Sequence, residues 1–179
     1  MQLIDTHAHL YSKEFAHDIE NVLTRSITNN VTKIYMPNID LTTIEPMLNL
    51  ADCYKEYCFA MIGLHPCYVT EDYAQVLDHM EKWLKKRRFY GIGEIGMDLY
   101  RDETYEKEQE LAFIRQLNWS RIYDLPLIIH CRPSIQSRSS YTKLIDILEK
   151  NQDGSLKGIF HCFNGTIEEA NKIIKLGFF

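Results

Sequence analysis

The 179 residues have the length of one globular domain and can bury a sizeable core. With 45% apolar and 25% charged residues, the composition is that of an ordinary soluble protein, and no run approaches the roughly 20 apolar residues of a membrane span. The five cysteines include no C-x-x-C pair, which argues for reduced thiols. The formal net charge of −5 argues against a phosphate-binding surface of Lys and Arg, although metal ions could supply positive charge locally.

Six short β-rich runs recur along the chain, and each is followed by a segment with helical apolar spacing, as at 19–27, 76–84 and 144–148. The first run meets charge at Asp5 with no basic region before it, so we expect no signal peptide and a cytoplasmic location. Thr166 and Glu169 form a capping-box pattern, which together with Gly177 predicts a helix over Thr166–Leu176. The predicted strands are Met1–His9, Val31–Pro37, Phe59–His65, Tyr90–Gly96, Leu125–Cys131 and Gly158–Cys162.

This alternation of strands and helices favours right-handed βαβ units and a parallel sheet. Continuous apolar runs at 59–62 and 127–129 indicate strands that are buried on both faces. A (β/α)₈ barrel and an open doubly wound sheet are the alternatives, and the lack of G-x-G-x-x-G after the first strand disfavours the dinucleotide-binding version. No linker or low-complexity segment interrupts the chain, which predicts one domain over residues 1–179.

Histidines and a glutamate fall at the ends of the predicted strands. In a barrel these strand ends share one face, so the side chains would converge. His7 and His9 are two apart on a strand and therefore face one side, where they could bind one ion together. Imidazole with carboxylate suits zinc, manganese and other first-row ions, and the lack of thiolate ligands is typical of a catalytic site. The candidates are His7, His9, His65, Glu94, His130 and His161.

Each of these residues also has a purely structural interpretation. A single histidine at a strand end is usually a hydrogen-bonded structural residue, and Glu94 could be a buried ion-pair partner. Several such residues at the same topological position favour a metal site instead, because coordination removes the cost of burying the carboxylate. His17 and His79 fall in predicted helices, and we expect both to be solvated.

Five motifs in chain order carry a family resemblance. They are Asp5-Thr6-His7-Ala8-His9-Leu10, Gly63-Leu64-His65-Pro66, Gly93-Glu94-Ile95-Gly96-Met97-Asp98, Ile129-His130-Cys131-Arg132 and His161-Cys162-Phe163-Asn164-Gly165. Together they resemble the TatD family of metal-dependent deoxyribonucleases, a branch of the amidohydrolase-type barrels, over Leu3 to Phe179. The resemblance implies a TIM-type (β/α) barrel and the cleavage of DNA phosphodiesters, including trimming from a 3′ end.

The resemblance also implies two divalent metal ions, which could be Zn²⁺, Mg²⁺ or Mn²⁺. His7 and His9 match the pair that holds the first ion. Glu94 matches the carboxylate that bridges both ions, and His130 and His161 match the ligands of the second.

Other positions suggest contacts with the substrate. By resemblance, His65 and Arg132 match positions near the substrate phosphate. The polar loop over Cys131–Tyr141 contains Arg132, Arg138 and four serines, which favours a lid or phosphate-contact role. Three aromatic residues follow strand ends and could stack bases or pack in the core: Tyr68, Tyr100 and Phe163.

The family's remaining ligand is an aspartate at the end of strand eight, which contacts the first ion and can take the proton from the attacking water. No residue up to Phe179 matches it, so the catalytic base is left unassigned. The ending Lys175–Phe179 resembles entry into strand seven. Because a full barrel has about 250 residues, we expect a C-terminally incomplete barrel, with about six strands and the start of the seventh, truncated before strand eight.

The leading hypothesis is a metal-dependent DNase that acts on single-stranded ends through two-metal-activated water. The same metal site could instead hydrolyse an amide or ester, such as an aminoacyl bond. A third hypothesis is an inactive metal-binding fragment. DNA is the predicted partner and no membrane contact is expected, while the metal, the strand polarity and the oligomeric state stay open.

Overall fold

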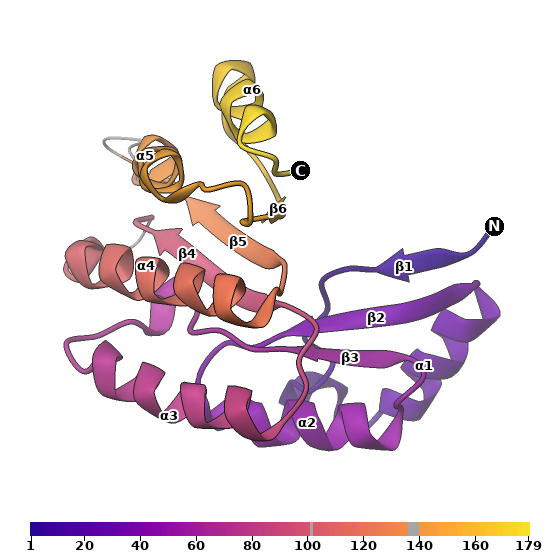
Figure 1. Ribbon diagram of the computed structural model, residues 1–179. Helices are drawn as coiled ribbons and strands as arrows, with labels where there is room; N and C mark the ends of the chain where they lie inside the picture. The colour runs from indigo at the N-terminus through magenta and orange to yellow at the C-terminus, as the bar shows by residue number, and fades with distance from the viewer. Residues whose placement is uncertain (101, 136–139) are drawn as a thin grey trace.

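The computed structural model describes residues 1–100, 102–135 and 140–179 (Figure 1). Its named strands are all parallel. They are β1 (Leu3–Asp5), β2 (Val31–Pro37), β3 (Cys58–Met61), β4 (Ile92–Asp98), β5 (Leu127–Arg132) and β6 (Gly158–His161).

Helices separate the strands, as the alternating pattern predicts. The α-helices are α1 (Ile19–Thr28), α2 (Ile44–Cys53), α3 (Tyr73–Lys86), α4 (Glu106–Tyr123), α5 (Ser140–Asn151) and α6 (Ile167–Lys175). Short 3₁₀ helices are η1 (Lys13–Phe15), η2 (Leu41–Thr43) and η3 (Pro66–Tyr68). None of the helices in the described ranges is long and apolar enough to cross a membrane.

The strands form two three-stranded sheets in chain order, β1-β2-β3 and β4-β5-β6. A parallel bridge between Ile62 and Ile92 joins the sheets, and the Gly93 amide donates to the Ile62 carbonyl at 2.9 Å. In Figure 1, α2 and α3 lie along one side of the first sheet, while α4 lies beside β4. The predicted α/β fold with parallel strands is confirmed.

Helix α3 buries one apolar face in the core. Leu77, Met80 and Leu84 lie one helical turn apart on α3 and are buried, as their spacing predicts. Burial of each such side chain contributes about 1.5–3 kcal/mol. This apolar packing stabilises the fold away from the carboxyl ends of the strands, where the polar residues lie.

The first strand is shorter than predicted. It ends at Asp5, whose Oδ1 accepts a hydrogen bond from the His7 amide at 3.0 Å. His7 and His9 therefore follow the strand and do not lie on it, although the Ala8 amide between them still donates to the Tyr35 carbonyl of β2 at 3.0 Å. The predicted strand end at His9 was wrong, but the two side chains face one side, with their Nε2 atoms 3.2 Å apart.

Later strand boundaries are also shifted, except in β2, which has the predicted bounds. β3 ends at Met61, after which Ile62 pairs with Ile92 of β4 and His65 becomes the N-cap of η3. β4 continues past Gly96 to Asp98. His17 lies in a turn between η1 and α1, so its predicted place in a helix was wrong, although it is exposed as expected.

The predicted last helix is confirmed. Both hydrogen bonds of the capping box between Thr166 and Glu169 are present, and Gly177 follows the helix with φ +88°. Phe178 then makes a parallel bridge to Gly158, beside β6. This bridge is where the sequence predicts entry into a further strand.

Strands β4 and β5 approach each other closely at Gly96. Its φ is +136°, and a Cβ atom at this position would lie 2.0 Å from the His130 carbonyl oxygen. Glycine meets both constraints because it lacks a Cβ. The close approach sets His130 beside Glu94, which lies two residues earlier on β4.

Candidate metal centre

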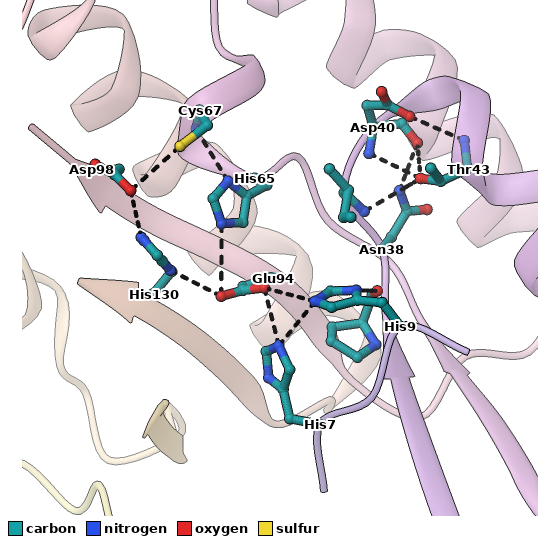
Figure 2. Close-up of polar contacts among 12 residues, drawn as sticks. His7, His9, Asn38, Asp40, Thr43, His65, Cys67, Glu94, Asp98 and His130 are labelled. Atoms are coloured by element: carbon teal, nitrogen blue, oxygen red, sulfur yellow. Dashed lines mark hydrogen bonds and ion pairs between the residues drawn. The ribbon is translucent and has the colours of Figure 1, made fainter. Parts of the chain in front are cut away.

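Glu94 lies on β4, is only 3% exposed, and is surrounded by imidazoles (Figure 2). Its Oε2 is 3.1 Å from His7 Nε2 and 3.4 Å from His9 Nε2. Its Oε1 is 3.0 Å from His130 Nδ1 and 3.7 Å from His65 Nε2. One carboxylate therefore faces two pairs of histidines, one pair at each oxygen.

These residues form two groups that could each hold an ion. In the first group, the ligand atoms of His7, His9 and Glu94 lie within 4.8 Å of one another, and those of His65, Glu94 and His130 do so in the second. The Nε2 atoms of His7 and His9 are 3.2 Å apart, a separation at which a shared cation relieves lone-pair repulsion. Nitrogen and carboxylate donors around a bridging glutamate fit a pair of divalent ions.

His161 occupies a different place from the other histidines. Its ring stacks on the His7 ring, with centroids 3.5 Å apart and an interplanar angle of 10°. Burial, followed by the charge of His7, lowers the pKa of His161. It belongs to neither three-residue group found among the described residues, whereas His65, expected near the substrate phosphate, belongs to the second.

Electrostatics around Glu94 favour its charged form. Burial alone would raise the pKa of this carboxyl, but hydrogen bonds led by those from His130 and His65 hold it well below the ordinary value. Burial likewise opposes protonation of His130, yet hydrogen bonds to Asp98 and Glu94 raise its pKa to about 9. Without an ion, His130 is therefore a cation at neutral pH, and a bound ion must displace that proton.

Residue Asp98 is a participant that the sequence patterns did not single out. It lies at the end of β4, is 8% exposed, and its Oδ2 is 2.9 Å from His130 Nε2. Burial opposes its charge, but hydrogen bonds led by His130 lower its pKa to about 2. Glu94 and Asp98 are four residues apart on one strand and therefore share a face, a signal that could have identified it.

Another polar residue that the sequence patterns missed, Asn38, holds the backbone of Glu94. Asn38 follows β2 and is fully buried. Its backbone carbonyl accepts from the Glu94 amide at 3.0 Å, and its backbone amide donates to the Gly93 carbonyl at 2.9 Å. Its Nδ2 donates to the Asp40 carbonyl at 2.6 Å and to Thr43 Oγ1 at 3.0 Å. The η2 turn thus anchors the strand that carries the central carboxylate (Figure 2).

His9 is oriented by groups beyond the carboxylate. Its Nδ1 lies 2.8 Å from the Tyr11 hydroxyl and 3.1 Å from the Pro37 carbonyl. The Tyr11 hydroxyl donates to the same carbonyl at 2.6 Å. Burial, then the charge of Glu94, raises the pKa of Tyr11, which stays a neutral donor. These contacts leave His9 Nε2 directed at the centre.

Arg132 lies on the solvent side of the second group. It is exposed, and its guanidinium carbon is 3.8 Å from the Tyr100 ring centroid. A cavity of about 420 Å³ adjoins this guanidinium and is lined by Pro66, Cys67, Val69, Asp98, Asp102, Tyr105, Gln109 and Arg132. An arginine beside an open cavity can bind a pair of phosphate oxygens.

The structure describes the three aromatic residues predicted to follow strand ends, and part of the predicted polar loop. Tyr68, Tyr100 and Phe163 are exposed rather than packed in the core. Tyr68 lies edge-on to His65 at 6.3 Å, and Phe163 packs edge-on against Tyr141 at 5.0 Å. In the predicted loop over residues 131–141, Arg138 and its neighbours at 136–139 lie outside the described residues.

Comparison with known proteins places this geometry in a family. The family model described as TatD related DNase matches residues 4–179. The metal-dependent hydrolase YjjV of Escherichia coli (strain K12) is 31% identical over 99% of this chain and 66% of its own length. The protein of Pantoea ananatis (strain LMG 20103) named 3′-5′ ssDNA/RNA exonuclease TatD is 27% identical over 98% of the chain and 65% of its own.

Solved structures agree with this comparison. The crystal structure of YjjV superposes with a TM-score of 0.86 at 30% identity, covering 98% of this chain and 66% of that one. The TatD family hydrolase of Entamoeba histolytica superposes with a TM-score of 0.84 at 25% identity, covering 99% and 64%. With the phosphotriesterase homology protein of Escherichia coli, at a TM-score of 0.69 and 15% identity, they support a TIM-type barrel fold. The chain spans about two thirds of the length of its curated relatives, and it belongs to the TatD-related DNase family.

Proposed function

We propose that this chain carries the metal centre of a hydrolase that cleaves phosphodiester bonds and releases nucleotides from single-stranded DNA ends. The observation that carries the proposal is the buried Glu94 carboxylate, which offers one oxygen to each of two histidine groups. Family membership and the exonuclease name of the Pantoea ananatis relative support this substrate class. Because the chain spans about two thirds of its relatives' length, the activity is proposed for the whole protein.

The metal-binding roles follow from the donor set. His7 and His9 would hold the first ion with one oxygen of Glu94, and His130 would hold the second with the other oxygen. His65 is the further donor that the geometry offers to the second ion, and His161 is the one that the family resemblance implies. When bound, two divalent ions supply Lewis acidity and hydroxide at neutral pH for an in-line displacement.

The protein's own residues bind and orient the substrate around these ions. Arg132 would bind the scissile phosphate through two parallel N–H donors, and the Tyr100 ring under its guanidinium holds that side chain in place. For the group that accepts the proton from the attacking water, the family resemblance implies an aspartate at the end of strand eight, and we assign that role to no residue named here.

A combined metal and cleavage assay tests the proposal. The chelator-treated chain is given Mg²⁺, Mn²⁺ or Zn²⁺, bound metal is counted, and nucleotide release from single-stranded DNA labelled at the 5′ end is measured. We expect a stoichiometry near two ions that falls in His130→Ala and is unchanged in His79→Ala, which alters an exposed helical histidine. No bound metal in the unmodified chain would overturn the proposal.

The same assay separates the competing hypotheses. Parallel ester and amide substrates, including an aminoacyl ester, test carbonyl hydrolysis by the same two-metal chemistry. Turnover of these substrates with no release from DNA would replace the nuclease proposal. Two bound ions without turnover of either class would identify this chain as a metal-binding part of a longer enzyme.

We further propose that the protein acts in the cytoplasm. Cys53, Cys58, Cys67, Cys131 and Cys162 are all free thiols, which suits a reducing compartment. Fractionation of cells that express the tagged protein, followed by immunoblotting, tests this location. Recovery in a secreted or membrane fraction would contradict it.

A further inference from the structure

We propose that Asp98 is the positioning residue of the second metal group: it holds the His130 ring so that Nδ1 is directed toward Glu94, where this nitrogen would bind the second ion. The inference rests on the proposed function, because it concerns the same metal centre. Asp98 is not among the ligand atoms of either three-residue group. Its role is therefore exerted through His130.

The geometry assigns the two ring nitrogens of His130 to different partners. Nδ1 is 3.0 Å from Glu94 Oε1, and Nε2 is 2.9 Å from Asp98 Oδ2 (Figure 2). An imidazole that binds an ion through Nδ1 must carry its proton on Nε2. A carboxylate at hydrogen-bond distance from Nε2 accepts that proton, fixes the tautomer and makes Nδ1 a stronger donor.

Asp98 is itself held in place by several groups. Its Oδ1 accepts from the Tyr100 amide at 3.1 Å, and its Oδ2 also accepts from the Cys67 thiol at 3.3 Å. Its backbone amide donates to Gln109 Oε1 at 2.9 Å, and Gln109 Nε2 donates back to its carbonyl at 3.2 Å. A carboxylate fixed on both oxygens and on its backbone can hold a ring without moving toward an ion.

The same contacts link the metal group to the substrate side. The Tyr100 amide donates to Asp98, and the Tyr100 ring lies under the Arg132 guanidinium. Asp98 therefore contacts both the metal-binding imidazole and the residue whose ring lies against the proposed phosphate contact. Its loss should affect the second ion before the first, because His7 and His9 lie at the opposite oxygen of Glu94.

Two variants and a matched control test the inference. Asp98→Ala removes the acceptor, Asp98→Asn keeps an amide oxygen that can accept from Nε2 but loses the charge, and Asp102→Asn alters an exposed carboxylate on the same cavity wall. The chelator-treated proteins are titrated with Zn²⁺ by calorimetry. We expect Asp98→Ala to weaken one of two binding steps by about 10–100-fold and leave the other nearly unchanged, with Asp98→Asn intermediate.

A spectroscopic readout separates positioning from general support. In the Zn²⁺-loaded wild type, ¹⁵N NMR of the histidine rings should show a protonated, hydrogen-bonded Nε2 at His130, and in Asp98→Ala the Nε2 proton should lose its hydrogen-bonded shift and exchange faster with water. Asp102→Asn should retain it. Thermal denaturation of the metal-free proteins checks folding, and if Asp98→Ala does not fold, the nearly isosteric Asp98→Asn decides the question.

The outcomes distinguish this inference from the proposed function. Wild-type affinity in both Asp98 variants, or an equal loss at both binding steps, would overturn the positioning role. Two ions in the wild type with one weakened step in the variants supports the role even if DNA is not cleaved. A wild-type chain that binds no zinc would overturn the proposed function and the inference together.

Discussion

The central residue of this structure is a carboxylate that water does not reach. Moving an isolated carboxylate from water into protein is expensive, and at Glu94 hydrogen bonds from four histidines, with His130 first among them, more than offset this cost. The same imidazoles lose their partner when the carboxylate loses its charge. The glutamate and its histidines are therefore mutually dependent.

This dependence predicts the result of Glu94→Gln. The amide keeps the size of the side chain but removes the charge shared by both metal groups. We therefore expect the affinity for both ions to fall by on the order of 100-fold or more, a larger loss than that from removing a hydrogen-bond partner of a ligand. Zinc titration measures the change. Glu20→Gln, on the exposed face of α1, is the control and should bind as the wild type does. Retention of either ion at full affinity in Glu94→Gln would contradict the shared role.

Protonation of His130 predicts a pH dependence for the metal-free chain. Its pKa is raised from 6.5 to about 9, so its stabilising contribution is present in full below about pH 6.5 and is lost as pH rises through 9. The pKa of His161 is lowered, so its contribution works the other way: it decreases the stability of the fold as the pH falls to 6.5 and below. We therefore expect the free energy of unfolding to fall by on the order of 1 kcal/mol between about pH 7 and 8.5.

Denaturant titrations in the presence of a chelator measure this slope. His130→Gln should flatten it, because the raised pKa is removed, and saturating zinc should also flatten it, because the metal-bound ring is already neutral. A slope that is equally steep in His130→Gln would assign the effect to other groups.

Sequence patterns predicted the ligand candidates because five motifs place them at strand ends, but they did not predict the hydrogen-bond partners. Asp98 and Asn38 act through contacts with residues far along the chain, such as Asp98 with His130. The roles of His65 and His161 depend on how the loops after β3 and β6 turn, which periodicity does not encode. Their assignment as ligand or substrate contact stays a prediction.

At the level of elements, Gly96 on β4 lets that strand approach β5 closely. Gly96→Ala places a Cβ against the His130 carbonyl and also strains a positive φ, so it should destabilise the fold by about 3 kcal/mol or more. Gly154 also has a positive φ, +92°, but has open space around it, so Gly154→Ala should cost only about 1–2 kcal/mol. Chemical denaturation compares the two, and equal losses would show that sterics at β5 do not matter.

Strand and helix identities were predictable, whereas their boundaries were less so. Apolar runs and capping residues identified β2 and α6 closely, because their signals are local. β1 ends early at Asp5, whose side chain accepts from the His7 amide, and β3 ends early where Ile62 pairs with Ile92 of β4 and no longer with β2. Whether a backbone group bonds to a side chain or to a neighbouring strand depends on segments that are distant along the chain, so the local sequence does not determine it.

At the scale of the whole molecule, β1 presents an exposed edge. Leu3 and Ile4 are 41% and 54% exposed, and β1 pairs only with β2 among the described residues. Exposed apolar edge strands pair with other chains, so we expect self-association that rises with concentration. Sedimentation velocity should show that Ile4→Lys reduces it, while Ile122→Lys, which changes a 70% exposed residue on α4, does not. Equal reduction by both would point to a general solubility effect.

The barrel type was predictable from strand–helix alternation together with the motif resemblance, and neighbouring structures support it. Closure of a barrel depends on strands that pair across the two ends of the sheet. Such pairing is not a local property of any segment. Beside β6, Phe178 bridges to Gly158, and Phe179 makes backbone hydrogen bonds to Gly158 and Phe160, as a further strand would.

The position of the metal centre has a consequence for folding. The first three strands form one sheet and the last three form another, and the donors come from both: His7 and His9 follow β1, while Glu94 and His130 lie on β4 and β5. An ion held by such donors would tie segments from both sheets together. Loading with metal should therefore raise the midpoint of thermal unfolding, because separating the sheets would also remove ligands from the ion, and chelation should lower that midpoint.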